Sequence, residues 1–319
     1  MQALASLIFA VIPMLLYLWI IWVMDRYDRE PLGLLALNFV WGALGAVLIG
    51  LVGSQLMRAA LQTNAYEDVV YVAPIIEEGA KALFLLFTAR DRRFDNITDG
   101  VVYGMAIGLG FGMTENFLYF LYAKTAGEWA ERVILRTFYT AVMHAMATGM
   151  FGVFVGVTKY RFRRYRIIFG LTGLAAAIGM HGLWNHWSTL DIAGLPLFQG
   201  LFIGFGLLVI IMVMQVSLFT ENQLILRELL EETQRGLLPQ VHLNYLPYSS
   251  KRKILGWLPP SIDKRLYVQL ATRLAFRKSQ MRYTKGTEQQ HFAEEVDALR
   301  MQIAAILSAE SKSDAARLY

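Results

Sequence analysis

Two adjacent glutamates, Glu77 and Glu78, lie in the middle of an apolar stretch that covers residues 69–88. A transmembrane helix needs roughly 20 residues, and a charged side chain at its centre costs about 2.5–3.5 kcal/mol on insertion scales. Paired carboxylates in different environments can supply both an acid and a base to one site. Lys81 shares a helix face with Glu77 and could hold that carboxylate charged. Neutralisation by Lys81 alone would be a structural role, but at this energetic cost we expect a functional one.

Three other apolar stretches carry polar side chains at a comparable depth. At ~1.5 Å per helical residue, Glu115 and Asn116 lie about 10–12 Å from the predicted outer end of their stretch. His144 lies ~16 Å and His181 ~12 Å from theirs, against roughly 12–14 Å for the glutamate pair. Asn185 follows His181 by four residues and shares its face. The sequence therefore predicts one polar layer, with Lys81 and Asn116 as supporting residues. The candidate catalytic residues are Glu77, Glu78, Glu115, His144, His181 and Asn185.

The composition indicates a polytopic membrane protein. Of the 319 residues, 56% are hydrophobic and only 17% are charged, against about 25% charged in ordinary soluble domains. The chain has no cysteine, which excludes disulfides, thiolate metal ligands and cysteine nucleophiles. A net charge of +5 in this setting indicates affinity for an anionic lipid leaflet rather than for nucleic acid.

We predict an all-α membrane helical bundle with about seven transmembrane helices. The first apolar run lacks a cationic region before it, so we expect a retained span rather than a cleaved signal peptide. Basic residues concentrate in the loops after the first, third and fifth spans and in the tail. This pattern predicts an outside N-terminus and a cytoplasmic tail at the cell membrane. The predicted spans cover residues 3–24, 33–56, 69–88, 99–123, 133–158, 166–189 and 194–219.

The composition changes after the last span, which predicts a membrane domain, 1–219, and a basic, partly amphipathic helical tail, 220–319. We expect one amphipathic helix over 221–235 and a second, capped by Ser261, that combines basic side chains with leucines and a phenylalanine. The second helix would lie on the anionic inner leaflet or pack as a solvated helix on the cytosolic loops. A further helix is expected over 287–308.

Three glycines, Gly104, Gly108 and Gly112, recur at every fourth position of the fourth predicted span. In a soluble protein such a cluster could bind phosphate, but in a membrane span it is typical of close helix packing. Close packing here would bring Glu115 towards the glutamate pair.

Four motifs occur in one order along the chain, and together they resemble the PrsW family of bacterial intramembrane proteases. They are Glu77-Glu78-x-x-Lys81, Phe111-Gly-x-x-Glu115-Asn116, His144, and His181-x-x-x-Asn185. That family belongs to a larger group with the CAAX prenyl endopeptidases and bacteriocin-processing proteases. The resemblance covers about residues 1–219. It implies a prokaryotic protease that hydrolyses peptide bonds within the membrane, with membrane-anchored regulators such as anti-sigma factors as substrates. Two features depart from the group: the CAAX branch has His where Glu115 stands, and the tail has no counterpart.

Amide hydrolysis requires an activated water, stabilisation of the oxyanion and protonation of the leaving amine. Either glutamate of the pair could be the general base, with Glu78 alternatively holding the geometry. Glu115 and His144 would position the water or bind a metal ion. His181 and Asn185 would stabilise the oxyanion.

The metal question stays open at the level of sequence. Glu78, His144 and His181 could form a three-ligand zinc site with an open position. A glutamate-activated water needs no ion, and the H-E-x-x-H motif of zincins is absent.

Two other classes of function compete with a protease. In a proton-coupled or ion-coupled transporter, intramembrane ionisable residues form a relay. We would then expect them to spread through the membrane, with helix breaks in related halves of the chain. A non-catalytic scaffold that recruits a partner through its tail leaves the buried glutamates unexplained. The single polar layer favours the protease.

Overall fold

A computed structural model of the chain describes residues 1–190 and 192–317, with side chains described as far as residue 308. It is 82% helical, and no strand occurs among these residues. The all-α prediction is therefore confirmed. The chain divides into two compact units: residues 1–25 with 30–215, and residues 26–29 with the chain from Val216 onward. The roles predicted for residues 1–219 and 220–319 stay predictions.

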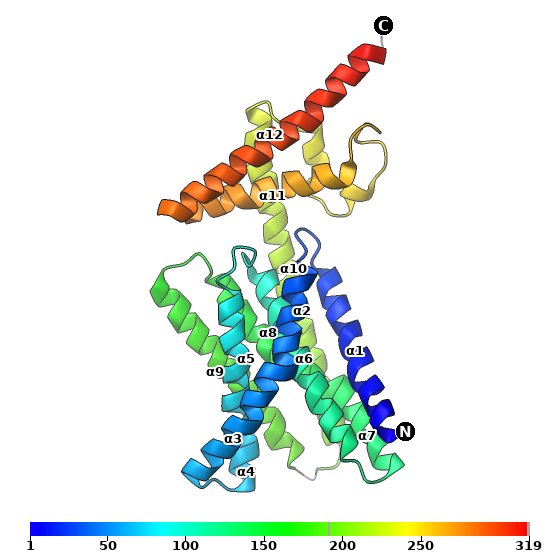
Figure 1. Ribbon diagram of the computed structural model, residues 1–319, viewed down its shortest axis with the longest axis vertical. Helices are drawn as coiled ribbons and strands as arrows, with labels where there is room; N and C mark the ends of the chain where they lie inside the picture. Colours follow the sequence, from blue (N-terminus) through cyan, green and yellow to red (C-terminus); the bar gives the residue numbers. More distant parts are fainter. Residues whose placement is uncertain (191, 318–319) are drawn as a thin grey trace. The chain divides into compact units, whose positions relative to one another are not determined.

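The first unit is a bundle of long helices that run roughly side by side (Figure 1). The helix α10 (Leu195–Gln234) begins in this unit and continues without interruption into the second. The separate helices predicted over 194–219 and 221–235 are therefore one helix. The other helical segments of the first unit are α1 (Gln2–Met24), α2 (Leu32–Val40), η1 (Trp41–Ala46), α3 (Val47–Leu61), α4 (Ala65–Glu67), η2 (Asp68–Val72), α5 (Ala73–Thr88), α6 (Ile97–Leu121), α7 (Ala126–Leu135), η3 (Arg136–Thr140), α8 (Ala141–Val157) and α9 (Arg163–Ser188).

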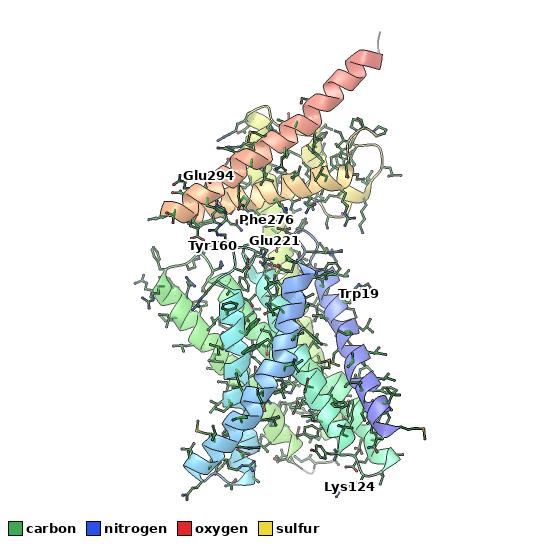
Figure 2. All side chains as sticks on the ribbon, viewed as in Figure 1. Trp19, Lys124, Tyr160, Glu221, Phe276 and Glu294 are labelled. Carbon is green, nitrogen blue, oxygen red and sulfur yellow. The ribbon has the colours of Figure 1, made fainter. Side chains whose placement is uncertain are left out.

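Five helical stretches of the described chain are long and apolar enough to cross a membrane. Their outer faces expose large apolar side chains; Trp19, for example, projects from α1 with 58% of its surface exposed (Figure 2). The five are residues 2–24, 32–61, 126–157, 163–188 and 195–234. The remaining two predicted spans correspond to the stretch ending in α5 and to α6. The bundle is thus confirmed, and the count of seven stays a prediction.

The helix α6 forms the centre of the first unit, because it packs against α8, α1, α2 and η1. Its glycines allow the close crossing with α8 that the four-residue spacing predicted. A Cβ atom added to Gly104 would lie 2.5 Å from the carbonyl oxygen of Thr148, and one added to Gly108 would lie 2.4 Å from that of His144. Larger residues at these positions would force the two helices apart.

Three of the long helical stretches contain a π-helical turn, a feature found frequently at functional sites. The turn η2 directly precedes α5, which carries Glu77, and η3 directly precedes α8, which carries His144. In η1, the indole N–H of Trp41 donates to the carbonyl of Ala80 on α5 (3.1 Å). Side chains that follow a π turn are rotated relative to an uninterrupted helix, so these turns help to aim both residues inward.

The second unit is a small helical assembly with its own apolar core. The helix α11 begins at Lys264, because the Asp263 carboxylate, rather than Ser261, caps its first N–H groups. Leu270 and Leu274 of α11 are buried in that core, so its apolar face is used within the unit. The helical segments of this unit are the end of α10, η4 (Gln240–Asn244), η5 (Lys251–Lys253), α11 (Lys264–Tyr283) and α12 (Gly286–Arg317).

Candidate active site

The buried carboxylate of Glu78 accepts hydrogen bonds from three side chains inside the first unit. Its Oε1 accepts from Lys81 Nζ (2.7 Å) and from His181 Nδ1 (3.0 Å), and its Oε2 accepts from the Thr148 hydroxyl (3.3 Å). The sequence predicted that Lys81 would pair with Glu77, and this is wrong. Both Lys81 and Glu78 point into the bundle and are almost fully buried, whereas Glu77 lies about 100° further around the helix. The Lys81 ammonium also lies 3.8 Å from the ring centre of Phe111.

The other glutamate of the pair, Glu77, has a carboxylate oxygen without a hydrogen-bond partner among the described residues. Its Oε2 is buried and accepts no hydrogen bond from any residue that the structure describes. His181 Nε2 is 3.8 Å away, too far for a direct hydrogen bond. Because His181 Nδ1 is bonded to Glu78, the lone pair of the neutral ring lies at Nε2, on the side of Glu77. The two atoms are close enough for one water molecule to bridge them.

The second histidine, His144, has both ring nitrogens engaged. Nδ1 accepts a hydrogen bond from Lys81 Nζ (3.1 Å). Nε2 therefore carries the ring hydrogen and donates a hydrogen bond to Glu115 Oε2 (2.7 Å). The ring meets that of His181 edge to face, with the ring centres 4.7 Å apart. The side chains of α5, α6, α8 and α9 therefore meet in one place, as the depth estimate predicted.

An arginine that the sequence analysis did not select completes this arrangement. Arg136, the first residue of η3, places Nη2 2.8 Å from Glu115 Oε2. Its Nε donates to the Asn116 side-chain oxygen (3.2 Å), and its guanidinium lies 3.7 Å from the ring centre of Tyr119. Asn116 thus reaches the site only through Arg136. In the sequence, Arg136 lies near the start of a predicted span, and the intramembrane Glu115, a carboxylate in need of a counter-charge, was the available signal.

The last candidate, Asn185, lies at the edge of this cluster. Its side-chain amide donates to the carbonyl of Val69 in η2 (2.9 Å). One hydrogen of the NH₂ group is therefore used to hold α9 against η2, and the second is not part of this contact. The structure does not bring Asn185 into hydrogen-bond contact with the glutamates.

The donor set suits a zinc ion, but with a different carboxylate from the one predicted. Glu77, His144 and His181 each offer one ligand atom, and these atoms lie within 4.8 Å of one another. At zinc ligand distances of about 2.0–2.2 Å, two ligand atoms of a tetrahedral site lie about 3.4 Å apart, so the 3.8 Å between His181 Nε2 and Glu77 Oε2 would shorten slightly on binding. Glu78 does not belong to this set, because its carboxylate accepts a hydrogen bond from His181 Nδ1. A metal-binding histidine usually donates its second ring N–H to a carboxylate in this way. Ligation through His144 Nε2 would require its hydrogen bonds to both Glu115 and Lys81 to open, because a neutral imidazole that binds zinc through one nitrogen carries its hydrogen on the other.

The comparisons with known proteins agree on one family. The profile of the PrsW family intramembrane metalloproteases matches residues 30–218, which include every candidate site residue. Protease PrsW of Clostridioides difficile (strain 630) is 33% identical over 160 residues, 48% of this chain and 65% of that protein. Protease PrsW of Geobacillus kaustophilus is 27% identical over 179 residues, covering 56% and 76% of the two chains. The Bacillus subtilis protein of that name is 24% identical over 162 residues, covering 50% and 72%. The chain therefore spans just under two thirds of the first relative. No solved structure matches the chain.

Proposed function

Because this chain belongs to the PrsW family of intramembrane metalloproteases, we propose that it hydrolyses a peptide bond of a membrane-anchored protein at the site around Glu77. Family membership supports the prediction of a membrane-embedded endopeptidase and gives no support to the transporter alternative. A scaffold without catalysis would have no use for an intramembrane carboxylate with an open oxygen. The residue roles below are part of the proposal.

The observation that supports this function best is the buried Oε2 of Glu77. Every other carboxylate of the site is held by at least one positively charged or hydrogen-bonding group: Glu78 by Lys81 and Glu115 by Arg136. Pairing of that kind reduces the ability of a carboxylate to take up a proton. Glu77 is therefore the carboxylate of the group with an oxygen open to accept a proton. We assign it the proton of the attacking water molecule; when a metal is bound, Glu77 would hold the ion through one carboxylate oxygen and accept this proton on the other.

The remaining side chains hold this arrangement in place. Glu78 fixes the ring orientation and the tautomer of His181, so that Nε2 faces the reacting atoms. Lys81 keeps Glu78 ionised and at the same time supplies a hydrogen bond to His144 Nδ1. Asn185 is positioned on the same face as His181, and its second amide hydrogen would serve the oxyanion of the substrate.

The residues that would hold the family's metal ion are Glu77, His144 and His181. When bound there, zinc would act as a Lewis acid towards water and the scissile carbonyl. Glu77 and the two histidines already converge without disturbing the Glu78–His181 hydrogen bond.

The proposed substrate and orientation rest on the family and on the charge pattern of the sequence. The relatives are bacterial, and we propose a bacterial cell membrane as the location. We keep the predicted outside N-terminus, the cytoplasmic tail and an anti-sigma-factor-like regulator as substrate as parts of this proposal. We also keep anionic lipid as a partner of the tail, although the apolar face of α11 is buried and cannot lie on a leaflet.

The test is cleavage of membrane-anchored reporter proteins in reconstituted vesicles, with metal content measured on the same samples. We expect Glu77→Gln and His181→Ala to abolish cleavage and to lower bound zinc, and a strong chelator to inhibit the wild type. Glu228→Gln, in the second unit, is the matched control for loss of a buried carboxylate. Cleavage that persists in Glu77→Gln would refute the assignment.

A further inference from the structure

The loop that follows η5 exposes two large aliphatic side chains to the surroundings. Ile254 is 50% exposed and Leu255 is 89% exposed, among the highest values for large apolar side chains in the described chain. They are followed by Gly256, whose φ of +83° lets the chain turn back sharply. We call Ile254 and Leu255 the loop tip. Two adjacent exposed aliphatic residues at a turn indicate a contact surface.

The base of this loop is held firmly, so the tip is presented in a defined way. Trp257 stacks on Tyr245, with ring centres 4.9 Å apart and planes 7° apart. Arg252 points inward, donating to the carbonyl of Leu246 (2.7 Å) and to the hydroxyl of Thr272 on α11 (2.8 Å). Only the tip and the lysines beside it are left outside these contacts.

The charge around the tip is strongly positive. Residues 248–266 contain five basic side chains and one acidic one, Asp263, which caps α11. Lys251 and Lys253 flank the tip, and neither forms an ion pair with a described carboxylate. Lys264 donates to the carbonyl of Ile254 (2.6 Å) and so places its positive charge beside the tip.

Several other basic residues of this unit differ, because carboxylates of the same unit already pair with them. Lys278 lies 2.7 Å from Glu232, and Arg277 lies 2.7 Å from Glu295. The basic helix that the sequence suggested for lipid binding therefore uses much of its charge internally. The lysines beside the loop tip do not.

We propose that the loop tip docks the second unit onto an anionic phospholipid surface, with Lys251, Lys253 and Lys264 against the headgroup phosphates. Ile254 and Leu255 would enter the boundary between headgroups and acyl chains, as aliphatic side chains of interfacial segments do. The helix α10 runs without interruption from a candidate membrane span into this unit, which keeps the loop at high effective concentration near a bilayer. This inference names the lipid-contacting element of the tail and does not depend on the protease activity.

The absence of cysteine from the chain makes a direct test possible. Leu255→Cys in the full-length protein is labelled with an environment-sensitive fluorophore, and the protein is placed in nanodiscs that contain lipids with brominated acyl chains. We expect quenching in discs with phosphatidylglycerol, and loss of quenching in discs of phosphatidylcholine alone or at high salt. Met301→Cys on α12, which replaces another exposed apolar side chain (68%), is the matched control and should not be quenched.

The charge contribution is tested by Lys251→Gln with Lys253→Gln in the labelled protein. Each lysine near an anionic surface contributes about a fivefold factor, so the pair should shift the docking equilibrium by about 30-fold. Quenching that is equal with and without anionic lipid would overturn the proposal. A label that is shielded from water but not quenched by brominated lipid would also overturn it, because the loop would then be covered by protein.

Discussion

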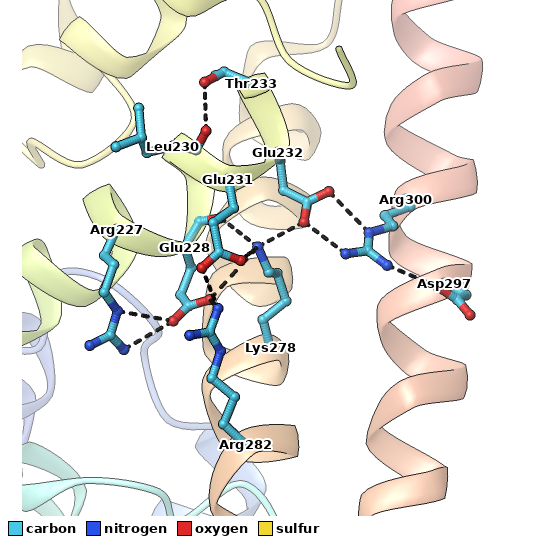
Figure 3. Close-up of polar contacts among 10 residues, drawn as sticks. All are labelled: Arg227, Glu228, Leu230, Glu231, Glu232, Thr233, Lys278, Arg282, Asp297 and Arg300. Carbon is cyan, nitrogen blue, oxygen red and sulfur yellow. Dashed lines mark hydrogen bonds and ion pairs between the residues drawn. The ribbon is translucent and has the colours of Figure 1, made fainter. Parts of the chain in front are cut away.

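Each unit of the molecule contains a cluster of buried ionisable side chains, and the two clusters differ in how their charges are matched. The site cluster consists of Glu77, Glu78, Lys81, Glu115, Arg136, His144 and His181. The tail network consists of Glu228, Glu231, Glu232, Lys278, Arg282 and Arg300. The tail network joins the end of α10 to α11 and α12 (Figure 3).

In the tail network every carboxylate is held by a basic side chain. Arg300 brackets Glu232 with two bonds of 2.8 and 3.0 Å, and Lys278 lies 2.7 Å from the same carboxylate. Arg282 reaches Glu228 at 3.0 Å and also pairs with Glu231. Such an arrangement links the three helices and leaves no carboxylate of the network unpaired.

In the site cluster the matching is incomplete. Glu77 Oε2 has no hydrogen bond within the described chain, and Nε2 of His181 lies 3.8 Å from it. Buried charge alone therefore does not identify an active site in this protein. Of the two clusters, the site cluster alone has a buried carboxylate oxygen, Glu77 Oε2, without a hydrogen bond to any described residue.

The strongest test of this comparison removes one carboxylate from each cluster. Glu77→Gln should lower cleavage about 10²–10⁴-fold, the usual contribution of a general base, with little loss of stability because Oε2 has no partner to leave behind. Glu228→Gln should leave the cleavage rate unchanged while weakening the tail network. Vesicle cleavage assays and hydrogen exchange on both proteins would measure the two effects. Equal losses of activity would remove the distinction between the clusters.

Removal of Lys278 should have the largest effect on stability. Lys278→Ala removes a buried cation that contacts all three carboxylates of the tail network. The arginines of the network remain, so the cost should approach but not exceed the roughly 3–5 kcal/mol of a broken buried pair. Arg227→Ala is the control, because Arg227 is half exposed and an exposed pair contributes about 0–1 kcal/mol. Native-state hydrogen exchange of α11 and α12 in the full-length protein gives both values. A small effect of Lys278→Ala would mean that apolar packing alone holds these helices.

Arg136 should affect activity less than Glu77, because it acts through Glu115. Arg136→Gln should reduce zinc affinity or cleavage about 10–100-fold, the range for residues behind a metal ligand. Arg136→Lys should restore only part of the loss, since a lysine cannot reproduce the contacts of the planar guanidinium with Asn116 and Tyr119.

The matched control for Arg136 is Arg132→Gln, which removes a surface ion pair with Glu128 one turn earlier. Equilibrium dialysis with zinc and separate measurement of kcat and KM would distinguish positioning from substrate binding. If Arg132→Gln and Arg136→Gln were equally impaired, Arg136 would have no specific role at the site.

The smallest expected effect is a pH dependence of the second unit. Burial lowers the pKa of His242, whose Nδ1 lies 2.8 Å from the Tyr267 hydroxyl. Below the unfolded pKa of about 6.5 the unfolded chain binds a proton that the folded unit resists. Stability should therefore fall as the pH drops below that value, and His242→Asn should flatten this dependence. Hydrogen exchange of α11, corrected for intrinsic rates, would show it; an unchanged slope would exclude His242 as the cause.

Several features of the site were predictable from residue type and spacing. The sequence indicated a polar layer shared by several spans, because each helical residue advances a fixed distance along the helix axis and the depth of a side chain can be counted from the end of its span. The residues placed in this layer were Glu77, Glu78, Glu115, His144 and His181. The glycine spacing of α6 predicted close packing because only the smallest side chain allows two backbones to approach so nearly. These inferences depend on local geometry, which the sequence carries.

The pairing of individual side chains depended on the tertiary structure. Lys81 could have reached either glutamate, and only the packing of α8 and α9 against α5 placed it with Glu78 and left Glu77 open. Arg136 joined the site because η3 rotates it towards Glu115. The basic residues of α11 were visible in the sequence, but the carboxylates that neutralise them come from α10 and α12. Charge and depth are thus encoded locally, whereas the partner of each charge is decided by helices that are distant in sequence and meet only in the folded protein.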